Sequence, residues 1–346
     1  MTSPPPVLAD HEGTHVTATV PMELTDAALA SDVVDGLALV EDGLRAAAEA
    51  NHEVLAEAAG HLMAAGGKRF RPTLVLLAAQ FGDPTDPRIV PAAVAVELTH
   101  LATLYHDDVM DEADVRRGSA SANSRWGNTV AILTGDYLFA RASEILADLG
   151  PEAIRIQAET FRRLVTGQIA ETVGCRPGDD PLEHYLGVVT QKTASLIATS
   201  GRFGAMFSGA PTSVIARVTP ACAALGVAFQ LSDDILDVSS ESTQSGKTPG
   251  TDLREGVRTL PMLHALRSAG PGDGRLVELL SMPELTDPVL HAEALALLRA
   301  HPAMEMAKAD TRRWAEQART EILGLPDVSA RSAFEALCEF VVGRTG

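Results

Sequence analysis

The chain has 346 residues, which is long enough for one large domain or two, and its formal net charge is −18. A surface this negative repels the phosphates of nucleic acids, so composition argues against a nucleic-acid-binding protein. Hydrophobic residues make up 46% and aromatic residues only 4%, a composition typical of closely packed helices. The cysteines Cys175, Cys222 and Cys338 are far apart, which indicates neither a zinc site nor a disulfide framework.

The first 22 residues are rich in proline and polar residues, and we expect them to form a flexible arm. Residues 23–346 are expected to form a single all-α domain. The N-terminal sequence lacks the charged-then-apolar order of a signal peptide, and no apolar run is expected to reach membrane-spanning length. These features predict a cytoplasmic protein without a transmembrane segment.

Helical patterns follow one another along the rest of the chain. The stretches 24–50 and 52–67 come first, and the second ends at a glycine pair suited to a helix C-terminus. The next helix opens at Pro72 and ends at Gly82. The sequences RPGDDP and SGKTPGTD are expected to be loops because of their glycine, proline and aspartate content. Further helices are expected at 89–111, 128–149, 152–173, 182–208, 212–238, 259–269, 286–300, 303–323 and 327–342.

Two of these helices end in the same pattern of aspartates. The first is LYHDDVMDEADVRRG at Leu104–Gly118, and the second is FQLSDDILDVSS at Phe229–Ser240. Because residues three and four apart share one face of a helix, each pattern forms an acidic stripe. Like charges at this spacing cost stability unless a cation neutralises them. The stripes contain His100, Thr103, Asp107 and Asp111, with Asp108 beside them, and Gln230, Asp233 or Asp234, and Asp237.

The composition of these stripes favours magnesium over zinc, because carboxylates without His or Cys partners are hard ligands. Magnesium takes only one or two carboxylates and completes its coordination shell from water and substrate phosphates. Two such half-sites indicate a phosphorylated substrate held between facing helices. The alternative is that each cluster is a solvated helix end, since surface acids are common.

Basic residues that could hold such a substrate occur at several places. GGKRFRP at Gly66–Pro72 puts Lys68, Arg69 and Arg71 at a glycine-rich junction, where arginine can bind phosphate with its guanidinium fork. Arg116 and Arg117 follow the first acidic cluster, where they either pair with nearby acids or face a diphosphate. Lys192 and Lys247 are two further candidates.

With these motifs in order, the chain resembles the trans-isoprenyl diphosphate synthases, also called polyprenyl synthetases. The resemblance runs from about Gly66 to Pro261 through GGKRFRP, ELTHLATLYHDDVMDEADVRRG, QKTASL, FQLSDDILD and GKTPGTDLREG. It implies the all-α isoprenoid-synthase helical bundle around a deep central cavity, as a homodimer. It also implies a prenyltransferase that condenses an allylic diphosphate with isopentenyl diphosphate.

The resemblance further implies roles for individual residues. Three Mg²⁺ ions would be bound by Asp107, Asp108, Asp111, Asp233, Asp234 and Asp237. Isopentenyl diphosphate would be bound by Lys68, Arg71, His100 and Arg117. The allylic diphosphate would be bound by Arg116, Lys192, Thr193, Gln230 and Lys247. Lys192 and the aspartates other than Asp237 would be catalytic, because they would stabilise the departing diphosphate.

Two features bear on activity and product length. Val257 stands where the family commonly has a diphosphate-binding lysine, and the neighbouring Arg258 points about 100° away on a helix. Ala102 and Thr103 are small residues one turn below Asp107, where short-chain synthases often carry a bulky aromatic residue. We therefore expect a product longer than geranylgeranyl diphosphate, with that four-unit product as the alternative.

Two other functions share parts of this pattern. A class I terpene cyclase has the same ionisation step, but it would not need GGKRFRP. A non-catalytic subunit of a heteromeric prenyl synthase is favoured only by Val257, because both aspartate motifs are intact.

Overall fold

The computed structural model describes residues 24–50, 52–240 and 249–345, and the expected N-terminal arm lies outside them. The first half forms α1 (Ala27–Ala48), α2 (Glu53–Ala64), α3 (Phe70–Ala79), α4 (Ile89–Met110), α5 (Ala122–Trp126), α6 (Asn128–Leu149) and α7 (Pro151–Val173). The second half forms α8 (Pro181–Lys192), α9 (Ala194–Phe207), α10 (Thr212–Ser239), α12 (Thr251–Arg254), α13 (Leu260–Ser268), α14 (Gly274–Leu280), α15 (Pro288–Ala300), α16 (Ala303–Ile322) and α17 (Ser329–Gly343). The all-α class is confirmed.

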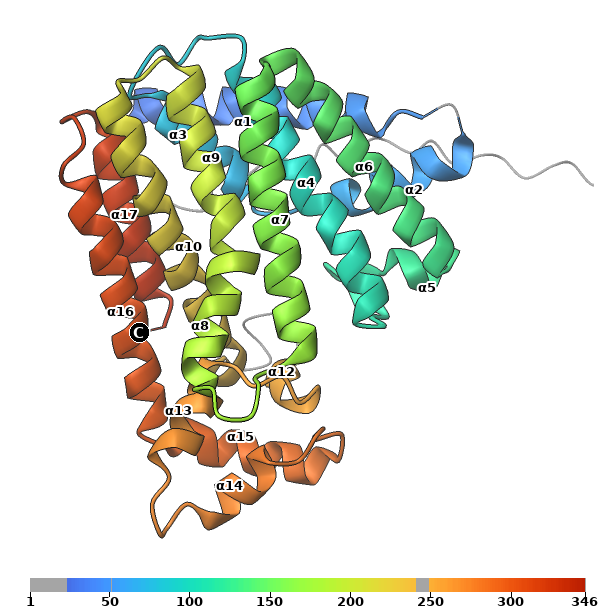
Figure 1. Cartoon of the computed structure of the whole chain (residues 1–346), viewed down its shortest axis with the longest axis vertical. Helices are drawn as coiled ribbons and strands as arrows, with labels where there is room; N and C mark the ends of the chain where they lie inside the picture. The colour runs from blue at the N-terminus through green and yellow to red at the C-terminus, as the bar shows by residue number, and fades with distance from the viewer. Residues whose placement is uncertain (1–23, 51, 241–248, 346) are drawn as a thin grey trace, which may run out of the picture.

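The long helices stand side by side along the longest axis of the molecule (Figure 1). Helices α4, α7 and α10 run in the same direction, so their C-terminal ends all lie in the lower half of this view. Helix α1 crosses the upper end, and α13, α14 and α15 close the lower end. Helix α4 packs on α6, and α10 packs on α9 and α16.

Two groups of buried apolar side chains hold the bundle together, and α10 belongs to both. Leu225 and Ala228 of α10 pack in the cluster that joins α1, α3, α4, α6, α9 and α17. Leu231 and Ile235 pack in the cluster that joins α8 with α13–α16. Helix α10 is thereby fixed along its length, which gives its C-terminal aspartates a rigid support.

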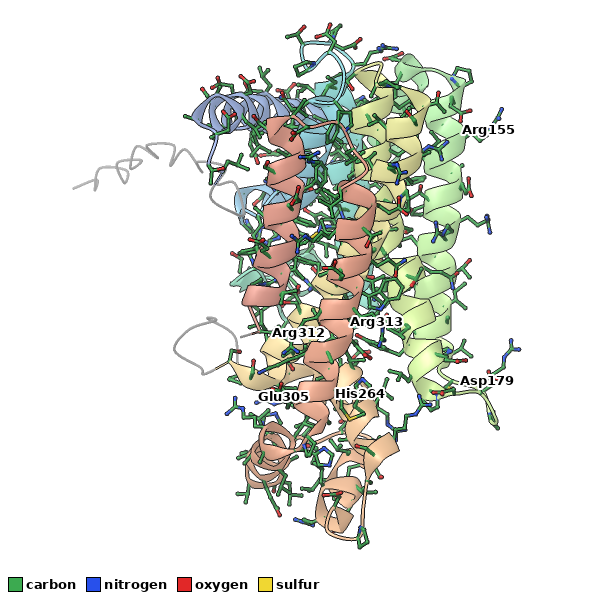
Figure 2. All side chains as sticks on the ribbon, turned by 90° about the vertical axis from the view of Figure 1, so that its left-hand side faces the viewer. Arg155, Asp179, His264, Glu305, Arg312 and Arg313 are labelled. Atoms are coloured by element: carbon green, nitrogen blue, oxygen red, sulfur yellow. The ribbon has the colours of Figure 1, made fainter. Side chains whose placement is uncertain are left out.

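The lower end is attached to the bundle through a buried contact between a histidine and an aspartate. His264 Nε2 on α13 lies 3.0 Å from Asp310 Oδ2 on α16, and Arg313 pairs with the same aspartate at 3.0 Å. Figure 2 labels His264 and Arg313 in the lower half of the molecule. Because the His264–Asp310 pair is buried, it also fixes how α13 docks on α16.

The structure differs from the expected elements in several places. The expected helix 182–208 is two helices that meet at Thr193, whose backbone (φ −97°, ψ −54°) leaves regular helical geometry. A short antiparallel hairpin, β1 (Val115–Arg116) and β2 (Ser119–Ala120), follows α4, and α5, α12 and α14 were not expected. Thr251 and Asp252, expected in a loop, begin α12.

The expectation that no apolar run reaches membrane-spanning length is wrong for α10. Within the described ranges α10 is the one helix whose length and composition would allow it to cross a membrane, with a mean hydropathy of 1.6 in its most apolar window. More than half of that window (56%) is buried inside the protein. A core helix is apolar because it packs in the protein interior, so it meets the same criterion of length and composition.

Candidate functional site

The first aspartate motif lies at the C-terminal end of α4, and its members face different surroundings. Asp111 is 56% exposed at the helix C-cap, and Asp107 is half-buried. Asp108 is completely buried, and its Oδ1 accepts a hydrogen bond from Arg116 Nε at 2.5 Å. Its Oδ2 is buried with no hydrogen-bond partner in the part of the chain that the structure describes. The β1–β2 hairpin thus returns Arg116 to neutralise the innermost carboxylate of the motif.

Asp107 shares its surroundings with charged groups from two other helices. Burial raises the pKa of Asp107 to about 6, and the nearby Lys192 ammonium opposes this shift. Lys192, the last residue of α8, forms an ion pair with Glu171 of α7. The carboxylate of Glu171 raises the pKa of Asp107 slightly further, so all three groups lie within one electrostatic environment.

The second motif repeats this arrangement at the end of α10. The side chain of Asp233 is 41% exposed and lies 2.5 Å from Nη2 of Arg344, directly after α17. Asp234 is buried, with Oδ2 accepting a hydrogen bond from the Tyr185 hydroxyl and Oδ1 accepting one from Gln230 Nε2 at 3.0 Å. Burial raises the pKa of Asp234 to about 7, and these two hydrogen bonds oppose the shift. In both motifs the second aspartate therefore points into the protein.

Asp237, the last aspartate of the second motif, connects α10 to α12. Its two carboxylate oxygens accept hydrogen bonds from the backbone N–H groups of Thr251 and Asp252, at 3.1 and 3.2 Å. Carboxylates at a helix N-terminus bind the free N–H groups of the first turn. Asp237 therefore anchors the start of the segment that carries Glu255.

Glu255 links the two motifs. Glu255 is exposed at the protein surface, and its pKa is raised by partial desolvation and next by the nearby carboxylates of Asp111 and Asp237. Asp111 ends the first motif and Asp237 ends the second, so the acidic ends of α4 and α10 face a common space. The sequence predicts that the two clusters act together, and the carboxylates that end both motifs are near enough to Glu255 to affect its pKa.

The donor set of this space suits a hard divalent cation. Its side chains offer carboxylate oxygens, and one of them, Asp108 Oδ2, is buried without a partner among the described residues. In the described ranges no three His, Cys, Asp or Glu side chains lie close enough to hold a metal ion by themselves. An ion bound here would need further oxygens, and magnesium takes these from water and phosphates.

A separate basic cluster surrounds His100, two turns before the first aspartates on α4. Burial holds the pKa of His100 well below its usual range, and the Arg71 and Arg117 guanidinium groups lower it further. Arg71 Nε is buried without a hydrogen-bond partner in the described structure. Arg117 donates to the carbonyl oxygens of Leu62, at 2.9 Å, and Gly66. Arg71 thus has a buried donor without an acceptor, as expected for a site that binds an anion.

The other basic residues have different surroundings. Lys68 is exposed at the α2–α3 junction. Arg69, in contrast, is buried and pairs with Glu41 and Glu97, so it holds α3 against α1 and α4. Lys247 lies outside the described residues. Val257 and Arg258 are exposed and lie between α12 and α13 rather than on a helix, so the expected helical separation of about 100° does not apply to them.

Close helix packing fixes the junction of α8 and α9. A Cβ atom on Gly167 of α7 would lie 2.6 Å from the backbone N of Lys192. On the other side, a Cβ atom on Gly226 of α10 would lie 2.9 Å from Cα of Ala194. Contacts this short exist only because both positions lack a side chain. The junction that carries Lys192 and Thr193 is therefore held between α7 and α10.

Four residues of this site were missed by sequence reasoning: Glu171, Tyr185, Glu255 and Arg344. Glu255 belongs to the quoted motif GKTPGTDLREG, so its acidic side chain was a signal that could have been used. The other three reach the site from separate segments, and only the fold brings them to the aspartates. No spacing in the sequence indicates such contacts.

Comparisons with known proteins agree on one family. Residues 52–321 match the model of the polyprenyl synthetase family. The chain is 52% identical to a nonaprenyl diphosphate synthase of Mycobacterium tuberculosis over 96% of this chain and 99% of that protein. It is 40% identical to component 2 of the heptaprenyl diphosphate synthase of Geobacillus stearothermophilus, over 91% and 97% of the two chains.

The fold agrees as well. The geranylgeranyl pyrophosphate synthase of Corynebacterium glutamicum, solved with calcium and isoprenyl diphosphate, superposes with a TM-score of 0.85 at 44% identity. The superposition covers 94% of this chain and all of that chain. The isoprenoid-synthase fold implied by the sequence motifs is thereby confirmed. The chain belongs to the polyprenyl synthetase family and is a prenyltransferase.

Proposed function

We propose that the chain is a trans-polyprenyl diphosphate synthase, which condenses an allylic diphosphate with isopentenyl diphosphate. The observation that carries this proposal is the convergence of both acidic helix ends around Glu255, with a separate basic cluster nearby. His100 precedes Asp107 by seven residues on α4, which is about 10 Å along the helix. One helix thus carries an anion site and a metal site, as a reaction between two diphosphates requires.

The metal is proposed to be Mg²⁺, with three ions bound together with the substrate diphosphate. Asp107, Asp111 and Asp233 have the more exposed carboxylates and are the first candidates to bind it. Asp108, Asp234 and Asp237 belong to the proposed set as well, and their oxygens, like that of Asp233 with Arg344, already accept hydrogen bonds from the protein. They would reach a metal only by exchanging these partners or through a free oxygen such as Asp108 Oδ2.

The chemistry follows from these surroundings. When bound, the divalent ions would stabilise the negative charge that develops on the departing diphosphate. Lys192 and Arg116 lie beside the first motif and would bind the same diphosphate with fixed positive charges. Arg71, His100, Arg117 and Lys68 would hold isopentenyl diphosphate so that its double bond attacks the allylic carbocation. A proton is then lost, by family analogy to the released diphosphate.

The proposed product is longer than geranylgeranyl diphosphate, of the kind used for quinone side chains. The 52% identical relative named as a nonaprenyl diphosphate synthase supports it, as do the small residues at Ala102 and Thr103. A four-unit product remains the second candidate, because a structural neighbour at 44% identity is named as a geranylgeranyl pyrophosphate synthase. Both candidates use the same site and differ only in when elongation stops.

We also propose a cytoplasmic homodimer built from one domain per chain. Large apolar side chains are exposed along α6 and α7, which supports an interface with a second copy. They are Ile132, Leu133, Ile154, Val165, Ile169 and Val173.

One assay separates this function from its two rivals. The purified protein is incubated alone with farnesyl diphosphate, isopentenyl diphosphate and Mg²⁺, and the products are identified by mass. We expect chain elongation. Hydrocarbon release would indicate a terpene cyclase instead. Inactivity rescued by a second protein would indicate a subunit of a heteromeric enzyme, a possibility raised by the relative named as component 2.

A further inference from the structure

Tyr185 of α8 contacts the second aspartate motif but belongs to none of the motifs that define the site. Its hydroxyl donates a hydrogen bond to Oδ2 of Asp234. A tyrosine hydroxyl in a partly buried position needs such a partner, and here the partner is a carboxyl oxygen in the protein interior. Asp234 in turn is only 4% exposed, so its two oxygens depend on protein donors.

The hydrogen bonds continue from Asp234 to the α8–α9 junction. Asp234 Oδ1 accepts a hydrogen bond from Gln230 Nε2 at 3.0 Å. Gln230 Oε1 accepts one from Thr193 Oγ1 at 3.2 Å. Four side chains from α8, α10 and the junction thus form one continuous chain: Tyr185, Asp234, Gln230 and Thr193.

The bonds of this chain all run toward Asp234. The structure places the Gln230 NH₂ group, which can only donate, against Oδ1 of Asp234. Its carbonyl oxygen then points to Thr193 and takes the hydroxyl proton of that residue. The Thr193 oxygen can therefore only accept from a further partner. A carboxylate held in place by Tyr185 fixes the orientation of two polar side chains beyond it.

These two side chains lie where the allylic diphosphate is proposed to bind. Thr193 directly follows Lys192, whose ammonium lies within electrostatic reach of Asp107. The junction itself cannot shift easily, because Gly167 and Gly226 let α7 and α10 pack against its backbone. The backbone is thus fixed by packing, and the side-chain orientations are fixed by the hydrogen-bonded chain.

We propose that Tyr185 is a positioning residue for the allylic substrate, and that it acts through Asp234 to hold Gln230 and Thr193 in one orientation beside Lys192. This inference rests on the proposed function. The inference assigns Tyr185 to the allylic substrate and not to isopentenyl diphosphate. The basic cluster around His100 lies on α3, α4 and the segment after β1, and it contains none of the side chains hydrogen-bonded from Tyr185 to Thr193.

The test uses Tyr185→Phe, which removes only the hydroxyl, together with Asp234→Asn and the double variant. Tyr137→Phe is the matched control, because it removes a tyrosine hydroxyl that donates to the backbone oxygen of Glu49, away from both motifs. Two quantities are measured for each protein. The first is kcat/KM for each substrate. The second is the affinity for farnesyl diphosphate with Mg²⁺, without isopentenyl diphosphate, measured by calorimetry.

We expect Tyr185→Phe to lower kcat/KM for the allylic substrate about tenfold, the effect of one hydrogen bond to a charged acceptor. Its affinity for farnesyl diphosphate should fall as well, whereas KM for isopentenyl diphosphate and the thermal unfolding temperature stay unchanged. The double variant should be no worse than Asp234→Asn alone, because both changes break the same chain. Tyr137→Phe should behave as the unmodified enzyme.

Three results would overturn the inference: equal losses for both substrates, unchanged farnesyl diphosphate affinity in Tyr185→Phe, or additive effects of the two substitutions. The proposed function fails on a different result. If the unmodified protein bound farnesyl diphosphate without extending it, elongation would be refuted, while the binding comparison would still decide the role of Tyr185.

Discussion

Neighbouring aspartates in each motif have opposite surroundings, although their side chains are chemically identical. Asp107 and Asp233 are partly exposed, whereas Asp108 and Asp234 are buried and bonded to Arg116 and to Tyr185 with Gln230. Adjacent residues of a helix point about 100° apart, so one aspartate of each pair lies on the more exposed side of the helix end and the other points into the protein. The buried member then needs partners, because an unpaired buried charge is very costly.

The two basic groups should act on different substrates. Arg71→Ala should chiefly raise KM for isopentenyl diphosphate, and Lys192→Ala should act on the allylic substrate. Losing one charge-assisted contact costs about 1.5–3 kcal/mol, which is roughly ten- to a hundredfold in affinity. Steady-state kinetics with each substrate varied in turn measure both effects. Arg258→Ala tests whether this exposed arginine takes the place of the lysine missing at Val257, and unchanged affinity for the allylic substrate would mean that it does not. Equal effects of Arg71→Ala and Lys192→Ala on both substrates would refute the assignment.

The raised pKa of Asp107 predicts how pH changes the stability of the metal-free protein. The folded carboxyl holds its proton up to about pH 6, whereas the unfolded one loses it near its ordinary value of 3.8. Between these values the folded state binds more protons, so the free energy of unfolding falls as pH rises. Asp107→Asn has no carboxyl to titrate, so its free energy of unfolding should not fall in this range. Relative to the unmodified protein, the variant should be more stable by on the order of 1–2 kcal/mol above pH 6.

Denaturant unfolding in the presence of EDTA, at pH 4.5 and at pH 7.5, measures this difference. The change should be read as variant minus unmodified protein, because His100 titrates in the opposite sense: its lowered pKa makes stability rise with pH. A difference that is constant with pH, or larger at pH 4.5, would contradict the burial of Asp107.

At the scale of elements, the sequence predicts well where helical periodicity is long and uninterrupted. The expected helices 128–149 and 89–111 match α6 and α4 to within a residue. The expected helix 182–208 was wrong as one element, since its apolar pattern continues across Thr193 while the backbone does not. The break lies where Gly167 and Gly226 of other helices pack against the backbone, a contact that local periodicity cannot indicate.

Prediction of the site from sequence is likewise limited to residues whose role depends on local type and spacing. The motifs name the aspartates and the arginines, because residue type and spacing are local properties. Arg344 reaches Asp233 from 111 residues further along the chain, and Tyr185 reaches Asp234 from 49 residues before it. Such partners follow from the packing of α17 and α8 against α10 and not from any sequence pattern.

Product length should be controlled on α4. Thr103 lies one turn before Asp107 and is half-buried, with its hydroxyl bonded to the carbonyl oxygen of His100 at 2.8 Å. Thr103→Phe should place a bulky floor below the metal site and shorten the product sharply, while the first condensation stays largely intact. Ala102→Phe should do the same, but Ala102 is only 1% exposed and overpacking there costs about 1–3 kcal/mol.

Mass analysis of the products measures this effect. Leu104→Phe is the matched control, since it adds an aromatic ring on the neighbouring face of α4 and should leave product length unchanged. If the unmodified enzyme stopped at three or four isoprene units, or if neither aromatic variant changed product length, the proposed floor would be wrong.

At the scale of the whole molecule, the exposed apolar face of α6 and α7 contrasts with a strongly acidic chain. Its net charge of −18 opposes association of two copies, so only a sizeable apolar contact would hold a dimer together. Ile169, 58% exposed on α7, lies in this face. Ile169→Asp should shift the molar mass measured by light scattering from dimer toward monomer, whereas Val289→Asp, at an exposed position of α15, should not. A monomeric unmodified protein would contradict the proposed interface.

The claim that both aspartate motifs form one catalytic centre is tested most directly by turnover of Asp107→Ala and Asp233→Ala across a Mg²⁺ titration. Each change removes a carboxylate that is proposed to bind metal, and bound metal matters mainly in the transition state. Each variant should therefore keep its fold and lose nearly all elongation activity. Circular dichroism and thermal unfolding provide the check on folding. Near-normal turnover of either variant at limiting Mg²⁺ would contradict the account.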